Sequence, residues 1–174
     1  MRQIILIGPP GSGKSSIGKE LATALGLTFI DTDALIVEAE GRAISDIFVD
    51  SGEAHFREIE ERTVGEALRL ENVVISLGGG AVLSEGTQSL IKSASSKGAE
   101  VIFFTISLTT AVERIGLNKE RPMLLINPRQ QWTALMQARF GIYEALATRT
   151  YSTDGADPKV LALEITSDME GSHA

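Results

Sequence analysis

Gly8-Pro9-Pro10-Gly11-Ser12-Gly13-Lys14-Ser15 fits the phosphate-binding template G-x-x-x-x-G-K-[ST] at every fixed position, and the rest of the chain is organised around it. A buried strand is predicted over 3–7, directly before this loop, and a helix with one apolar face over 16–25, directly after it. An ordinary glycine-rich turn is the alternative. The strand, loop and helix together instead predict a loop that binds the phosphates of a nucleoside triphosphate through its N–H groups and the helix dipole.

The predicted nucleotide contacts lie along the loop and the first helical turn. Lys14 is expected to reach the β- and γ-phosphates, and the Ser15 hydroxyl is expected to bind Mg²⁺. The full set of predicted ATP contacts in this part of the chain is Gly11, Ser12, Gly13, Lys14, Ser15 and Ser16.

Composition excludes several other classes of protein. The 174 residues, 43% hydrophobic and 22% charged, are typical of one globular domain. No apolar run reaches the ~18 residues that span a bilayer, and the first residues lack a secretory pattern, so we expect a cytoplasmic protein without a membrane partner. The absence of cysteine excludes disulfides and thiol catalysis, and the net charge of −7 argues against a nucleic-acid partner.

Strand and helix signals alternate along the remaining chain without a repeat or a long linker. Further strands are predicted at 27–30, 73–77, 101–106 and 151–153. Helices are predicted at 34–40, from 44, and at 53–70, 86–96, 109–115, 128–147 and after 157–158. This pattern indicates an α/β fold with a parallel sheet covered on both faces, whose ligands bind beyond the carboxyl ends of the strands.

Two acids follow the second predicted strand. Many phosphate-loop proteins hold Mg²⁺ partly through an acid at the end of another strand, yet the strand at 73–77 ends in glycine. Asp31 and Asp33 would point the same way if the extended geometry continued past the strand. One could then hold Mg²⁺ through water and the other could hydrogen-bond the attacking hydroxyl. Alternatively, Asp33 could cap the helix that follows.

Three arginines and a triple glycine are further candidates. Arg57 and Arg139 could bind a carboxylate through paired hydrogen bonds, although the acids around both also favour surface salt bridges. Arg121 precedes a proline in a stretch between two helices, as expected of a lid that carries an arginine onto the transferring phosphoryl group. Gly78-Gly79-Gly80 has no side chains and favours close approach of the backbone to a ligand.

Six motifs, taken in chain order, resemble those of the shikimate kinase family. They are the phosphate loop, Asp31-Thr32-Asp33, Gly52-Glu53-x-x-Phe56-Arg57-x-x-Glu60, Ser76-Leu77-Gly78-Gly79-Gly80, Arg121-Pro122-x-Leu124 and Arg139-x-x-x-Tyr143. The resemblance covers roughly residues 1–160. It implies a three-layer P-loop kinase fold with a five-stranded parallel sheet in the order 2-3-1-4-5. It also implies transfer of the γ-phosphoryl group of ATP to the 3-hydroxyl of shikimate, a step toward chorismate and the aromatic amino acids.

The resemblance also implies roles on the acceptor side of the site. Asp33 would contact the shikimate hydroxyls and accept the reacting proton. Arg57, Gly79 and Arg139 would complete the substrate site, with both arginines on the carboxylate, and Glu60 would position Arg57.

On the donor side, the resemblance implies that Ser15 and Asp31 serve Mg²⁺, Asp31 through water. Lys14 and Arg121 would stabilise the charge on the transferring group, and Arg114 would lie against the adenine.

The expected organisation is a single domain, 1–174, with a substrate-binding region at about 32–62 and a lid at about 114–126, acting as a monomer. Two other functions remain open on the sequence. A gluconate or nucleotide kinase would share the loop and the lid, and a nucleotide-dependent switch would bind a protein partner in place of a small substrate.

Overall fold

The computed structural model describes residues 2–116 and 127–171, which form an α/β fold around one parallel sheet. The strand order is β2-β3-β1-β4-β5, and every neighbouring pair is parallel, which confirms the predicted topology. The strands are β1 (Gln3–Ile7), β2 (Thr28–Asp31), β3 (Val73–Ser76), β4 (Glu100–Thr105) and β5 (Arg149–Ser152).

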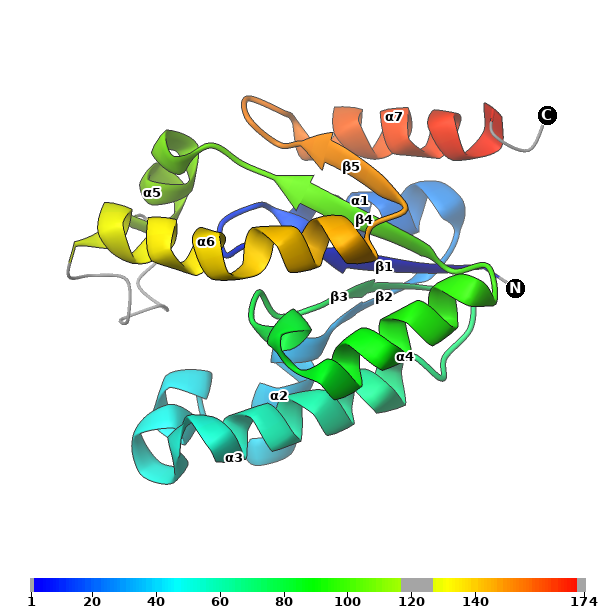
Figure 1. The fold of residues 1–174 in the computed structure, drawn as a ribbon. Coiled ribbons are helices and arrows are strands. Elements are labelled where there is room, and N and C mark those ends of the chain that lie inside the picture. Colours follow the sequence, from blue (N-terminus) through cyan, green and yellow to red (C-terminus); the bar gives the residue numbers. More distant parts are fainter. Residues whose placement is uncertain (1, 117–126, 172–174) are drawn as a thin grey trace.

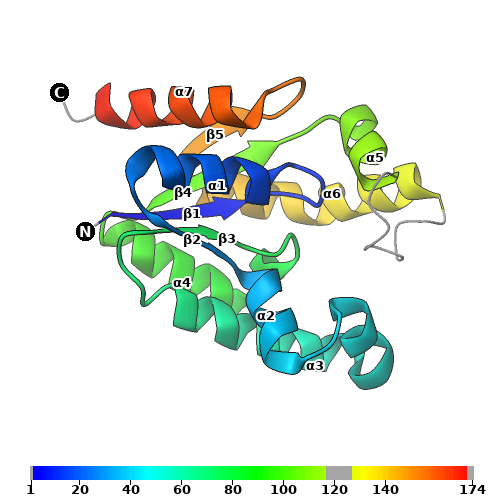
Figure 2. The same cartoon turned by 180° about the vertical axis from the view of Figure 1, so that it is seen from behind.

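Helices cover both faces of the sheet (Figures 1 and 2). Because side chains alternate along a strand, Ile4 and Leu6 of β1 pack in one apolar cluster while Ile5 and Ile7 pack in another. The first cluster includes residues of α1 (Lys14–Leu25) and α7 (Pro158–Gly171), and the second includes residues of α3 (Ile44–Ala67), α4 (Glu85–Ser96) and α6 (Pro128–Leu146). The three-layer architecture therefore follows from the apolar strands.

The remaining helices are α2 (Thr32–Glu40), α5 (Leu108–Gly116) and the short 3-10 helix η1 (Ala81–Leu83). α3 is interrupted at Gly52, whose φ of 82° and ψ of 166° are not helical. Glycine reaches this conformation without the steric cost that a side chain would add. The interruption agrees with the two separate helical segments predicted on either side of this residue.

Strand register brings three loops to one edge of the sheet. Ser76 of β3 is aligned with Leu6 of β1 on one side and with Asp31 of β2 on the other. The phosphate loop, the segment at 31–33 and the triple glycine therefore leave the sheet at the same level. This edge is where parallel sheets bind ligands.

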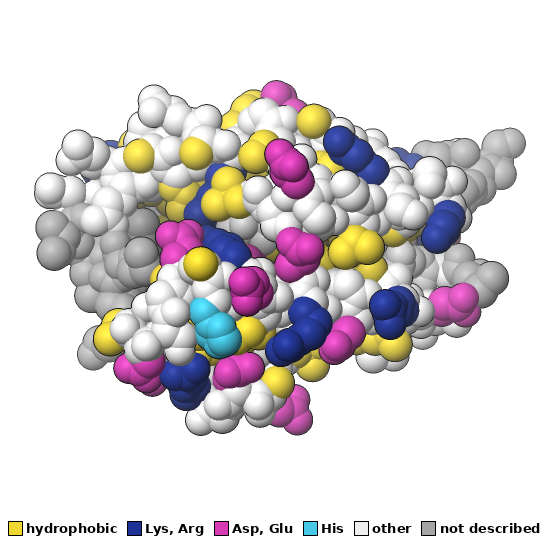
Figure 3. All heavy atoms as spheres, turned by 60° about the horizontal axis from the view of Figure 1, so that its bottom comes forward, with side chains coloured by type: hydrophobic (Ala, Val, Ile, Leu, Met, Phe, Trp, Pro, Cys, Tyr) yellow, Lys and Arg dark blue, Asp and Glu magenta, His cyan; other side chains and the backbone are white. Residues whose placement is uncertain are grey.

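Acidic and basic side chains are interspersed on the face of the molecule shown in Figure 3. Among the residues that the structure describes, no helix is long and apolar enough to cross a membrane.

Candidate active site

The phosphate loop holds a buried ammonium group. Gly13, at the N-terminus of α1, has a φ of 83°, which glycine adopts at little steric cost because it has no Cβ. α1 begins at the next residue, Lys14. Lys14 is 7% exposed, and its Nζ donates to the carbonyls of Gly8 at 2.8 Å and Pro9 at 3.1 Å. The loop thus fixes a positive charge beside its own backbone, as required for binding phosphate.

Ser12 and Ser16, two predicted ATP contacts, differ in exposure. Ser12 is fully buried, and its amide donates to the carbonyl of Pro9 at 3.2 Å, whereas Ser16 is exposed. Gly11 and Ser15 are half-buried.

Asp31 joins the phosphate loop to α2. The Ser15 hydroxyl donates to Oδ2 of Asp31. The other oxygen, Oδ1, accepts from the amides of Asp33 at 3.0 Å and Ala34 at 3.4 Å and so caps α2. The extended geometry ends at Asp31, so the expectation that both acids point the same way because of strand alternation does not apply, and the cap is Asp31 and not Asp33.

The hydroxyl and carboxylate oxygens of Ser15 and Asp31 fit Mg²⁺, which prefers oxygen ligands and commonly binds through one or two protein groups together with phosphates and water. No group of three or more histidines, cysteines or acids that could hold a metal occurs among the described residues. A cation here would therefore depend on nucleotide phosphates and water for its other ligands.

Asp33 lies beside the glycine turn together with a buried acid. A Cβ placed on Gly78 would lie 2.5 Å from Oδ1 of Asp33 and 2.8 Å from Oε1 of Glu60. A side chain at this position would displace one or both carboxyl groups. Glu60 is 2% exposed, and this burial raises its pKa above the ordinary value of 4.5. The charge of Asp33 adds to the rise in pKa, whereas Arg57 and Arg139 oppose it.

Arg57 is held in place by two acids and two aromatic rings. Its guanidinium contacts Glu60 at 2.6 Å and Glu53 at 3.3 Å. It also lies over the rings of Phe48 and Phe56, 5.9 and 5.3 Å from their centroids. A planar guanidinium held in this way is oriented before a ligand binds.

The sequence had favoured a surface salt bridge as the ordinary interpretation of Arg57 and Arg139. Arg57 does form ion pairs, but Glu60 is buried, and a Cβ on Gly80 would lie 2.5 Å from Nη1 of Arg57. Arg139 is half-buried on α6, and its charge acts on the same Glu60. Arg57 of α3 thus lies at the glycine turn, and Arg139 acts on the neighbouring Glu60 from a different helix.

The glycine turn separates the phosphate loop from the arginines. A Cβ on Gly79 would lie 2.9 Å from Cδ of Pro10, so the turn packs directly on the loop. The hydroxyl of Thr32 accepts from the amide of Gly78 at 3.2 Å, and the Tyr143 hydroxyl donates to the carbonyl of Gly79 at 2.5 Å. The motifs contain Thr32 and Tyr143, but sequence reasoning assigned neither a role.

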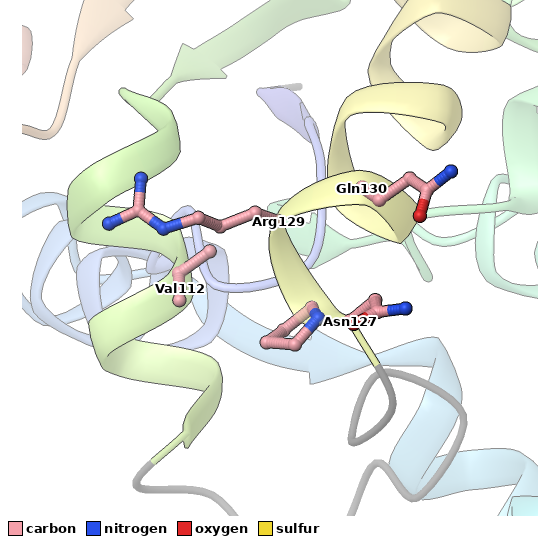
Figure 4. A pocket seen from close by; sticks show the side chains of 5 residues that line it. Val112, Asn127, Arg129 and Gln130 are labelled. Carbon is pink, nitrogen blue, oxygen red and sulfur yellow. The ribbon is translucent and has the colours of Figure 1, made fainter.

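Arg114 and Arg121 are the two remaining predicted ATP contacts. Arg114 donates to the carbonyls of Gly11 at 3.2 Å and Thr153 at 2.8 Å, and so connects the phosphate loop to the segment after β5. Arg121 and most of the predicted lid lie outside the described residues. A separate pocket of about 450 Å³ lies between α5 and the start of α6, and none of the described residues that line it is a predicted site residue (Figure 4). Its lining residues are Val112, Asn127, Pro128, Arg129 and Gln130.

Comparisons with known proteins agree with this geometry. The model of the shikimate kinase family matches residues 10–170. The shikimate kinase of Streptomyces coelicolor is 47% identical over 156 residues, which cover 90% of this chain and 88% of that protein. The structure of the shikimate kinase from Acinetobacter baumannii in complex with shikimate has a TM-score of 0.92 at 29% identity, covering 99% of this chain and 94% of the other.

A gluconokinase from Sinorhizobium meliloti, with a TM-score of 0.51 at 22% identity over 87% of this chain and 81% of its own, shares the fold alone. The matched family model and the identity over most of the chain agree with the six motifs, five of which lie in the described part of the fold. The chain therefore belongs to the shikimate kinase family.

Proposed function

We propose that the chain transfers the γ-phosphoryl group of ATP to the 3-hydroxyl of shikimate, giving shikimate 3-phosphate and ADP. Family membership makes it an ATP-dependent kinase with an alcohol as acceptor. The observation that carries the proposal is the contact of Gly79 with Pro10, because it joins the phosphate loop to the glycine turn against which Arg57 packs. The donor and acceptor sites thereby share one boundary, as direct transfer between two bound substrates requires.

On the acceptor side, Arg57 and Arg139 bind the shikimate carboxylate. Arg57 is already oriented by Glu60, so the cost of ordering its side chain is largely met before binding. Asp33 accepts the proton of the attacking hydroxyl, and the backbone of Gly79 borders the ring. The region at about 32–62, which comprises α2 and most of α3, supplies Asp33 and Arg57 to this acceptor side.

On the donor side, the loop amides and the start of α1 bind the phosphates, and Lys14 neutralises charge on the β- and γ-phosphoryl oxygens. Arg114 supports the adenine side, and Arg121, in the lid at about 114–126, completes the charge neutralisation. Catalysis comes from positioning and electrostatic stabilisation, without a covalent intermediate. Ser15 and Asp31 would hold Mg²⁺, Asp31 through water, and the ion would supply additional charge neutralisation between the phosphates.

The assay that tests the proposal is shikimate-dependent release of ADP, measured by coupling to pyruvate kinase and lactate dehydrogenase in the presence of MgCl₂. The product should be identified as shikimate 3-phosphate by mass spectrometry. Matched reactions with gluconate, with a nucleoside monophosphate and without an acceptor serve as controls. ADP release that does not depend on shikimate would contradict the proposal. ADP release that depends on gluconate would identify gluconate as the acceptor instead.

The protein is further proposed to act in the cytoplasm as a monomer and as a single domain, without a nucleic-acid partner. The net charge of −7 supports the last point, because nucleic-acid surfaces are generally basic. Light scattering after size-exclusion chromatography tests the oligomeric state, and a dimer mass would refute the monomer.

A further inference from the structure

We infer that Tyr143 is a positioning residue that sets the glycine turn relative to Arg139, and thereby determines how tightly the acceptor is bound. The inference rests on the proposed function. Its starting observation is the hydrogen bond from the Tyr143 hydroxyl to the carbonyl of Gly79, two residues separated by 64 positions in the chain.

The Tyr143 ring is fixed independently of this hydrogen bond. The residue is 0% exposed, and its ring stacks on Phe103 of β4 with centroids 5.0 Å apart and planes inclined by 27°. Phe103 is itself fully buried in the sheet. The hydroxyl therefore projects from a rigid base, and its position is set by the packing of α6 on the sheet.

The hydrogen bond orients a peptide group that borders the acceptor site. The Gly79 carbonyl belongs to the peptide that links Gly79 to Gly80, and a trans peptide is planar, so fixing the direction of the C=O also fixes the direction of the Gly80 N–H. Glycine residues have no side chains to hold this orientation. Thr32 holds the preceding peptide through the amide of Gly78, from the opposite end of the turn.

Tyr143 and Arg139 are four residues apart on α6 and therefore lie on the same face of the helix. The hydroxyl thus links the glycine turn to α6, the helix that carries Arg139. The other arginine, Arg57 of α3, lies next to Gly80. Without the hydroxyl, the glycine turn, Arg139 and Arg57 would all still be present, but the position of the turn relative to the two arginines would be less strictly fixed. Orientation errors of this kind weaken binding without unfolding the protein.

The test compares Tyr143→Phe with Tyr151→Phe. Each change removes one hydroxyl and keeps the ring, but the hydroxyl of Tyr151, the only other tyrosine, donates to Asp168 at 2.9 Å between β5 and α7. We expect Tyr143→Phe to raise the KM and the Kd for shikimate about three- to tenfold, the range for loss of one neutral hydrogen bond, while the KM for ATP stays within about twofold. Tyr151→Phe should leave both KM values unchanged.

A double-substitution cycle with Arg139→Ala separates positioning from general stability. If the hydroxyl acts by aligning the turn with Arg139, Tyr143→Phe should weaken shikimate binding much less in the Arg139→Ala background than in the unmodified protein. Equal effects in both backgrounds, equal changes in the two KM values, or a lower thermal midpoint with unchanged shikimate KM would overturn the inference. Absence of shikimate-dependent turnover in the unmodified protein would refute the proposed function. If the unmodified protein turns shikimate over but the outcomes above are seen, only the inference about Tyr143 is refuted.

Discussion

Arg57→Ala is the substitution that tests the acceptor site most directly. The side chain of Arg57 is 23% exposed and that of its partner Glu60 is 3% exposed. Nη1 of Arg57 lies 2.6 Å from Oε2 of Glu60. Truncation removes one cation from the shikimate carboxylate, which for a largely desolvated charge contact costs about 2–5 kcal/mol of binding free energy. The Kd for shikimate should therefore rise about 30- to 5,000-fold, at about 1.4 kcal/mol for each factor of ten.

The same substitution leaves the carboxylate of Glu60 buried without its nearest cation. Breaking a buried ion pair destabilises by about 3–5 kcal/mol, and the partial exposure of Arg57 places this case near the lower end. The combined variant Arg57→Ala with Glu60→Gln should recover most of that stability but none of the shikimate affinity. Urea unfolding measures the first effect, and calorimetric titration with shikimate measures the second.

Titration with a non-hydrolysable ATP analogue is the control, and its Kd should change by less than about twofold because Arg57 makes no contact with the phosphate loop among the interactions described. Arg57→Lys keeps the charge but loses the paired geometry. Its affinity for shikimate should therefore lie between those of the unmodified protein and Arg57→Ala. If Arg57→Ala binds shikimate within about threefold of the unmodified protein, Arg57 does not bind the carboxylate. If adding Glu60→Gln restores the affinity, the buried carboxylate of Glu60 is the cause of the loss.

Two other substitutions follow from the same geometry. Asp33→Asn should lower turnover about 10²- to 10⁴-fold, the range for loss of a general base, and should keep the fold because Asp31 provides the cap of α2; near-normal ADP release would exclude Asp33 from the chemistry. Glu60→Gln should change the dependence of stability on pH. The folded-state pKa of Glu60 is raised, mainly by burial, so its stabilising contribution is complete below 4.5 and is lost as the pH rises through the raised pKa. As the pH rises from 4 to 7, urea unfolding should therefore show the free energy of unfolding of Glu60→Gln increasing relative to that of the unmodified protein. A difference that stays constant or changes in the opposite direction would contradict the burial of a charged Glu60.

The fold was predictable because its signals are local. The phosphate loop, the continuous apolar strands and the helices between them each occupy a short stretch, and together they predict a parallel sheet covered on both faces. The strand order was implied by the resemblance to the shikimate kinase family. The strand ends at Asp31 and Gly78 indicated where the site would form. The two helical segments predicted from 44 and at 53–70 lie on either side of the break at Gly52.

The detailed site could not be predicted because it depends on contacts between distant segments. Burial of Glu60, on which its pKa depends, requires both α3 and the glycine turn to be in place. The contact of Gly79 with Pro10 and the hydrogen bond from Tyr143 join three elements whose spacing no local pattern records. Asp31 illustrates a different limit, because sequence alone could not decide which of two nearby acids would cap α2.

Asp31 divides its two oxygens between the two halves of the site, one on Ser15 and the other on the first turn of α2, which carries Asp33. A nucleotide with its cation that alters the first contact will alter the second, and a ligand that moves α2 will act back on Ser15. Thermodynamic linkage makes such a coupling reciprocal, so each substrate must change the affinity for the other by the same factor. In this chain the carboxylate of Asp31 is one direct link between the donor and acceptor sides.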